Sequence, residues 1–318
     1  MAVTLAQAKL NVQDDLQAGI IDEFRKSSFL MDNLTFDDCV SPTGGGATLT
    51  YGYTRLISQP TADFRSVNSE YTPSEVGKQR YTVDLKVFGG AYEIDRIIAG
   101  MGGIADEVAL QARQKVKAAS ALFNDTVING DSSKDSDAFD GLDVALAGSD
   151  TEFNAGGSVI DLSTAEAIKT NADAFLLALH KAMGKLDGKP TALMGNSDMI
   201  AALEFLAKYQ GRYQERKDDF GNYYTTYNGI PLVDLGAKAG SNDPVVANGA
   251  DGSSLYFARF GLDGFHAISM AGHAPIKTWL PDFSTAGAVK KGEVEMVAAI
   301  ALKATKAAGV MRKIKVTA

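Results

Sequence analysis

Two segments in the N-terminal part of the chain alternate apolar and polar residues with the period of two that a half-buried strand shows. One face of each is apolar: Leu49, Tyr51, Tyr53 and Ile57 in the first segment, and Tyr81, Val83, Leu85 and Val87 in the second. The 21 residues between Ile57 and Gln79 are too polar to bury, and hairpin loops usually take only about 2–5. The pattern predicts a long two-stranded flap that projects from the body. Because an isolated hairpin is marginal in water, we expect the flap to lean on a neighbouring molecule.

A period of three to four residues predicts the longest helix over residues 104–128. Its apolar stripe consists of Val108, Ala112, Val116, Ala119, Phe123 and Val127. Asp106 and Glu107 lie in the first turn, where the helix dipole favours acids, and Asn129-Gly130 supplies the stop. At 1.5 Å per residue this helix would be about 37 Å long. We therefore expect it to act as a spine.

A second helix is predicted to begin at a capping box formed by Ser163 and Glu166. Its inward residues are Ile168, Ala172, Phe175, Leu179 and Met183. Residues 184–190 end this helix, strand, helix and strand patterns alternate after it, and residues 294–302 suit a buried strand. The mixture of long helices with antiparallel-type strands predicts an α+β fold.

Residues 1–43 are polar and mixed, with short helical signals at residues 15–24 and 29–34. Ile20, Ile21 and Phe24 make only a narrow stripe. Such a segment has too little apolar surface for a core of its own, so we expect an arm that packs on something else. The run from Pro42 to Gly46 breaks any regular element.

Composition narrows the class of protein. The chain has 318 residues, 45% of them apolar, a formal charge of −8 and one cysteine, Cys39. A single cysteine excludes an internal disulfide and a cysteine-based zinc cluster. The acidic balance argues against tight binding of a nucleic-acid backbone, which needs lysine and arginine. No apolar run approaches the length of a membrane helix, and Met1 is not followed by a signal-peptide pattern.

The order of these segments resembles that of the major capsid proteins of tailed bacteriophages, whose fold encapsulins share. The arm, the flap, the strand-turn at residues 91–97 and the spine helix come first. The middle series then runs through residues 189–196, 198–208, 210–213, 228–233, 255–261 and 264–269, and residues 293–316 close the chain. The resemblance implies an N-terminal arm (1–46), an E-loop hairpin (47–90), a P-domain with the spine helix (91–165), an A-domain (166–286) and a C-terminal P-domain strand (287–318).

The resemblance also implies a function: a structural subunit that assembles into the pentamers and hexamers of an icosahedral shell around phage double-stranded DNA. It would be made in the bacterial cytoplasm and end in the virion. The expected partners are further copies, a separate scaffolding protein, a portal, a decoration protein and non-specifically contacted DNA, with no membrane. The arm starts almost at Met1, so the resemblance implies either that separate scaffolding protein or assembly without one. Some members cross-link through an E-loop lysine, but residues 61–74 contain none, and we expect no cross-linking.

The candidate chemistry is sparse, and we expect no catalytic, cofactor or metal residues. Five acids, Asp131, Asp135, Asp137, Asp140 and Asp143, share one loop, but their spacing fails the calcium-loop pattern, and a solvated loop is the alternative. His180, His266 and His273 are too scattered to indicate a triad, and Cys39 has no nearby partner in sequence. Glycines at 44–46, 77, 102–103 and 188 lack the rest of a nucleotide-binding motif.

Two segments keep a nucleic-acid contact open. Residues 208–227 interleave aromatic and basic side chains, as single-strand binders do, although Glu215, Asp218 and Asp219 dilute the charge. By the resemblance, this segment would be a loop near the centre of a capsomer. A basic bias near the C-terminus comes from Lys303, Lys306, Arg312, Lys313 and Lys315, and a solvated face explains it equally well.

Three alternatives remain at this stage. An encapsulin-type nanocompartment would keep the fold and enclose a cargo protein in place of a genome. A phage tail or decoration protein would lack the spine helix and the middle series. An enzyme with a site assembled from distant residues would need a constellation of His, Asp or Cys that the sequence does not show.

Overall fold

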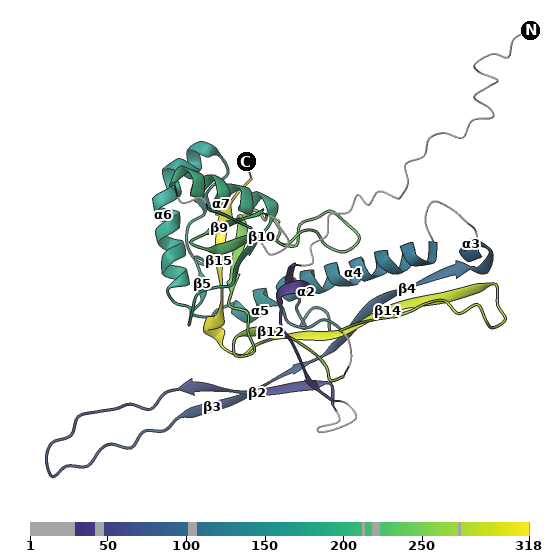
Figure 1. The fold of residues 1–318 in the computed structure, drawn as a ribbon. Helices are drawn as coiled ribbons and strands as arrows, with labels where there is room; N and C mark the ends of the chain where they lie inside the picture. The colour runs from purple at the N-terminus through teal and green to yellow at the C-terminus, as the bar shows by residue number, and fades with distance from the viewer. Residues whose placement is uncertain are drawn as a thin grey trace, which may run out of the picture.

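The computed structural model describes residues 29–41, 48–100, 107–211, 214–217, 223–272 and 275–317, and confirms the α+β class. The described residues form three parts, each built on one sheet. The body is a five-stranded sheet with the spine helix, the head is an eight-stranded sheet with two helices, and the flap is a two-stranded hairpin. Figure 1 shows the flap projecting away from both other parts.

The body is organised around one long strand, β14 (Val289–Leu302), which is longer than the 294–302 strand predicted. Its first part pairs with β4 (Lys86–Asp95) and β13 (Ile276–Trp279), and its last part pairs with β12 (Phe265–Met270). At the edge, β1 (Phe36–Val40) adds in parallel to β12. The helices α2 (Phe29–Asn33), α3 (Arg96–Gly100) and α5 (Leu142–Leu146) are short.

The spine helix is α4 (Glu107–Asn129), which runs along β4 and β14 (Figure 1). Ala119, Phe123 and Val127 of the predicted stripe are buried, whereas Val108, Ala112 and Val116 are only partly covered. The stripe is therefore confirmed in the half of the helix that lies over the body. Residues 104–106 of the predicted helix are outside the described residues.

The head contains β5 (Glu152–Phe153), β6 (Ile160–Asp161), β7 (Ala192–Gly195), β8 (Gln214–Lys217), β9 (Tyr223–Tyr227), β10 (Ile230–Asp234), β11 (Ser253–Ala258) and β15 (Ala308–Lys315). The strand order is β5-β15-β11-β7-β10-β9-β8, with β6 also on β15. A 3-10 turn at Thr305–Ala307 joins β14 to β15. The β8–β9 hairpin lies within residues 208–227, the segment expected to be a loop.

Two cores cover the two faces of the head sheet. Leu193 of β7 and Phe257 of β11 pack under α6 (Ala165–Met183) and α7 (Ser197–Tyr209). Their chain neighbours Met194 and Tyr256 point the other way, into a core shared with α4 and the body sheet. Burial on both faces explains why these strands read as continuous apolar runs. The shared core also holds head and body together.

The capping box predicted at residue 163 is wrong by one residue. Thr164 caps α6, and its side-chain oxygen accepts a hydrogen bond from Ala167 N at 3.1 Å. Ser163 instead donates to Asp161 Oδ1, so Glu166 is not in the position of a capping partner. The inward residues of this helix are confirmed except Met183, which is only partly buried.

The flap consists of β2 (Thr50–Ser58) and β3 (Gly77–Asp84), in antiparallel register from Thr50 opposite Asp84 to Ser58 opposite Gly77. The second strand predicted for the flap does not continue through Val87. It ends before the buried Leu85, and the chain then enters β4 of the body. The arm predicted for residues 1–43 lies outside the described residues up to Ser28. The described remainder packs on the body of the same chain, with Leu30, Leu34 and Val40 buried.

Candidate assembly surfaces

The outer part of the flap exposes large apolar side chains. These are Leu56, Ile57, Phe64, Val67, Tyr71 and Val76, with exposed fractions from 41% for Val76 to 107% for Phe64. Arg65 orders the tip, since its Nη1 donates to the carbonyls of Ser66 and Ser69 and its guanidinium lies 5.4 Å from the centre of the Tyr71 ring. Exposed apolar groups gathered on a projection are typical of a surface that another molecule covers.

The root of the flap, in contrast, is fixed to its own chain. Tyr53 Oη donates to Leu302 O at 3.1 Å, and Arg55 donates to the carbonyls of Leu302 and Lys303 at 2.6 and 2.9 Å. Arg55 also lies 4.3 Å from the centre of the Tyr81 ring, a cation–π contact. Tyr51 is buried against the body. Of the apolar faces predicted for the two strands, Tyr51 and Leu85 are therefore buried, whereas Leu49, Ile57 and Val87 are exposed.

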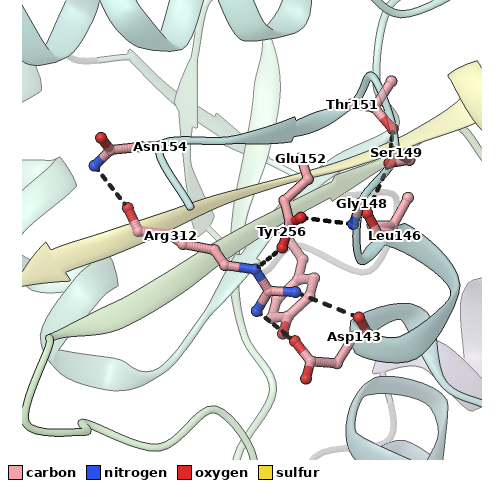
Figure 2. A network of polar contacts seen from close by, with 9 residues as sticks. All are labelled: Asp143, Leu146, Gly148, Ser149, Thr151, Glu152, Asn154, Tyr256 and Arg312. Carbon is pink, nitrogen blue, oxygen red and sulfur yellow. Dashed lines mark hydrogen bonds and ion pairs between the residues drawn. The ribbon is translucent and has the colours of Figure 1, made fainter. Parts of the chain in front are cut away.

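A polar network centred on Arg312 joins the head to the short helix α5 (Figure 2). From β15, Arg312 Nε donates to Glu152 Oε1, Nη1 donates to Asp143 Oδ1 at 2.6 Å, and Nη2 donates to the Asp143 carbonyl at 3.3 Å. The same Asp143 oxygen accepts from Tyr256 Oη at 2.8 Å. Glu152 accepts in addition from Gly148 N at 2.7 Å. One guanidinium thus connects β15, β5 and α5.

Burial and charge set the ionisation of this network. Burial raises the pKa of the Tyr256 hydroxyl, and the neighbouring Asp143 carboxylate raises it further. Burial lowers the pKa of the Arg312 guanidinium, but the hydrogen bonds that it donates to Asp143 and Glu152 outweigh this effect, and the net shift of the pKa is upward. Tyr256 therefore stays a neutral donor and Arg312 stays charged at neutral pH. The network is a fixed structural connection.

The sequence offered a solvated loop for Asp143 and a solvated face for Arg312 as alternatives to a binding role, and did not predict that the two residues pair. Arg312 is 21% exposed and Asp143 42% exposed, and each holds the other. In the rest of the acidic loop Asp135, Asp137 and Asp140 are exposed, whereas Asp131 is only partly exposed. Hydrogen bonds from Lys134 and Ser133 lower the pKa of Asp131 to about 2. Within the described ranges, no group of three or more His, Cys, Asp or Glu side chains could hold a metal ion.

The remaining candidates for chemistry lie apart from one another. His180 Nε2 and Tyr227 Oη are 2.9 Å apart between α6 and β9, which makes that histidine structural. His266 is buried in β12, and His273 is outside the described residues. Cys39 is exposed on β1, and partial desolvation of its thiol together with the nearby Asp37 raises the pKa of that thiol, the opposite of an activated nucleophile.

An open cleft of about 820 Å³ lies between the flap root, the head and the turn after β14. Its charged lining residues are of both signs: Arg55, Asp150, Asp187, Asp263, Lys303 and Lys306. On one side Arg259 spans Asp187 and Asp263, with contacts of 3.0 and 3.1 Å. A lining so balanced favours no single charged ligand. No helix in the described part of the chain has the length and apolar character needed to cross a membrane.

Comparison with solved structures adds the deciding observation. The encapsulin of the holo-SrpI complex from Synechococcus elongatus superposes with a TM-score of 0.66 over 100% of this chain and 98% of that one, at 13% identity. The capsid of the native GTA particle gives 0.64 over 99% of each chain, also at 13% identity. This chain has the shell-protein fold. A structure from Mycobacterium phage Bobi agrees, at 0.62 over 98% of each chain and 13% identity.

The fold resemblance expected from the sequence is therefore confirmed along nearly the entire chain. It rests on structure, because no protein-family model and no curated protein sequence matches the chain. The spine helix and the middle series, which a tail or decoration protein would lack, are both present: the helix as α4, and the series as β7, α7, β10 and β11 of the head followed by β12 of the body.

Proposed function

We propose that this chain is the major subunit of an icosahedral phage shell, assembled from pentamers and hexamers of itself around double-stranded DNA. The observation that carries the proposal is the flap: a fixed root, and beyond it a projection whose apolar side chains have no cover within the described chain. Such a surface needs a partner, and in a one-protein shell the partner is another copy. The fold supports this reading.

In this proposal each part has a place in the shell. The flap, within residues 47–90, lies across the adjacent subunit, and the proposed A-domain, residues 166–286, which supplies most of the head, meets its copies around the five- and six-fold axes. The proposed P-domain consists of residues 91–165, with α4, and the C-terminal segment 287–318, and residues 1–46 extend beneath neighbours. A scaffolding protein, a portal and a decoration protein are proposed partners, and DNA is contacted non-specifically. We assign the chain no catalytic role and place it in the virion.

The register of the flap offers a sharp test. Ser58 and Gly77 are paired across the hairpin, so residues 59–76 can be replaced by Asn-Gly, which favours a two-residue turn. The replacement removes Phe64, Val67 and Tyr71 but leaves Tyr53 and Arg55 in their contacts. We expect a folded subunit with unchanged circular dichroism that no longer forms shells under conditions where the parent chain does. Shells of normal size and yield from the trimmed chain would refute the role of the flap.

The second candidate function is an encapsulin-type nanocompartment, favoured by the likeness to the encapsulin structure. The two functions differ in what the shell holds. Particles purified from the natural source should contain nuclease-sensitive DNA after opening if the chain is a viral subunit, and a cargo protein if it is a nanocompartment.

A further inference from the structure

A histidine is buried beneath the flap root. His266 on β12 is 0% exposed, and neither of its ring nitrogens makes a hydrogen bond. Tyr51, the first buried residue of β2, covers it edge-on, with the two ring centres 6.0 Å apart. A buried imidazole without a hydrogen-bond partner is costly, and it stays only where the surrounding packing holds it. The flap root is part of that packing.

Charged groups from each adjoining element face this histidine. From β1, Asp37 Oδ2 lies 3.8 Å from His266 Nε2, and it accepts a hydrogen bond from Tyr51 Oη at 2.8 Å. Lys303, just after β14, brings its Nζ to 3.8 Å from the same carboxylate oxygen and 5.4 Å from the centre of the Tyr51 ring. Cys39 on β1 and Asp263 before β12 complete the titratable surroundings.

These groups determine the protonation state of His266 while the flap root lies over it. Burial and the positive charge of Lys303 lower the pKa of His266, and they outweigh the negative charges of Asp37 and Asp263, which raise it. The ring is therefore neutral while Tyr51 lies over it. A hydrated ring, freed from beneath Tyr51, would regain the ordinary histidine pKa of about 6.5. Acid thus favours the state in which the flap root has lifted.

We propose that His266, Asp37 and Tyr51 form an acid-released latch, which seats the flap root on the body while the imidazole is neutral and frees it when the imidazole is protonated. The seated state keeps its full stability above about pH 6.5 and loses it as the pH falls below that value toward the lower pKa of the buried ring. Tyr53 and Arg55 donate to main-chain carbonyls, which carry no ionisable group, so release begins at the Tyr51 end.

The latch lies within a single chain and can be measured without a shell. Its use in a shell, where release would change the angle of the flap, rests on the proposed function. Amide hydrogen exchange on the purified full chain measures it. The protection factors of β2 amides near Tyr51 are compared at pH 7.5 and 5.0, with amides of β11 as the internal standard. If the seated ring resists protonation, the opening constant of the root rises by up to about 30-fold over this interval.

Two variants make the experiment decisive. His266→Phe keeps an aromatic ring under Tyr51 without a titrating group, and it should abolish the pH dependence of β2 protection. His180→Gln is the matched control, because His180 lies elsewhere, between α6 and β9, and this variant should keep the dependence. The latch does not exist if the protection of β2 amides in the parent chain is independent of pH. It also does not exist if His266→Phe loses as much β2 protection at pH 5.0 as the parent chain does.

A separate measurement covers the case in which His266→Phe fails to fold. The imidazole carbon-bound protons of His266 can be titrated by NMR in the parent chain. A midpoint below that of a histidine in a denatured control supports the latch, and a midpoint at or above it overturns the latch. Neither result bears on shell formation, so failure of the latch and failure of the proposed function can be told apart.

Discussion

Replacing Arg312 with methionine would remove the guanidinium that connects β15, β5 and α5 while keeping an unbranched apolar stem. Glu152 is 13% exposed and would keep one donor, the Gly148 amide. Asp143 is 42% exposed and would keep Tyr256, so water compensates much of its loss. Breaking a fully buried ion pair costs about 3–5 kcal/mol, and exposed pairs contribute at most about 1. Because the Arg312 network is half-buried, we expect Arg312→Met to lower the free energy of unfolding by an amount between these two costs, about 2–3 kcal/mol.

The assay is reversible urea or thermal unfolding followed by circular dichroism. At roughly 2.1 cal/mol/K per residue, a loss of this size lowers the Tm by about 3–5 °C. Arg113→Met on the exposed face of α4 removes the same charge without a network, and should shift stability by less than about 0.5 kcal/mol. Adding Glu152→Gln to Arg312→Met should recover part of the loss, because it removes the carboxylate charge left without its partner. Equal stability of the Arg312 and Arg113 variants would refute this reasoning.

Two further predictions concern a close contact between strands and a helix cap, and both are checked by the same unfolding assay. Gly89→Ala would place a Cβ 2.0 Å from the Val294 carbonyl oxygen and force β4 away from β14, at a cost of about 1–3 kcal/mol or more, whereas Gly100→Ala meets nothing within 4 Å and should be neutral. Thr164→Ala should cost about 1 kcal/mol through loss of the α6 cap, and Glu166→Ala less than about 0.5; the reverse order would restore the capping box first predicted.

The periodicity of apolar residues predicted those elements whose buried face follows from their own sequence. The spine helix and α6 follow from apolar residues at helical spacing, since one face of each meets a core. The central head strands β7 and β11 were predictable because both faces of their sheet are covered, which makes their apolar runs continuous. The β8–β9 hairpin, in contrast, falls in a segment expected to be a loop. The break at Leu85 was not readable, because the alternation of apolar residues continues through it although the partner strand changes from β2 to β14.

The contacts that fix the parts relative to one another could not be predicted from the sequence. Arg312 lies 169 and 160 residues from Asp143 and Glu152, and Arg55 lies 248 residues from the Lys303 carbonyl. No local pattern distinguishes such a basic residue from a solvated one. The same holds for His266, whose surroundings come from β1, β2 and the end of β14. The exposed tip of the flap, in contrast, was predictable from the length and polarity of its connection.

The central claim is that copies of this chain close into a shell. Negative-stain microscopy of the purified chain, alone and with a candidate scaffolding partner, tests it most directly. We expect closed shells, or five- and six-membered rings whose class averages show the head at the centre. Small particles of one subunit's size in both preparations, at concentrations well above micromolar, would contradict the account.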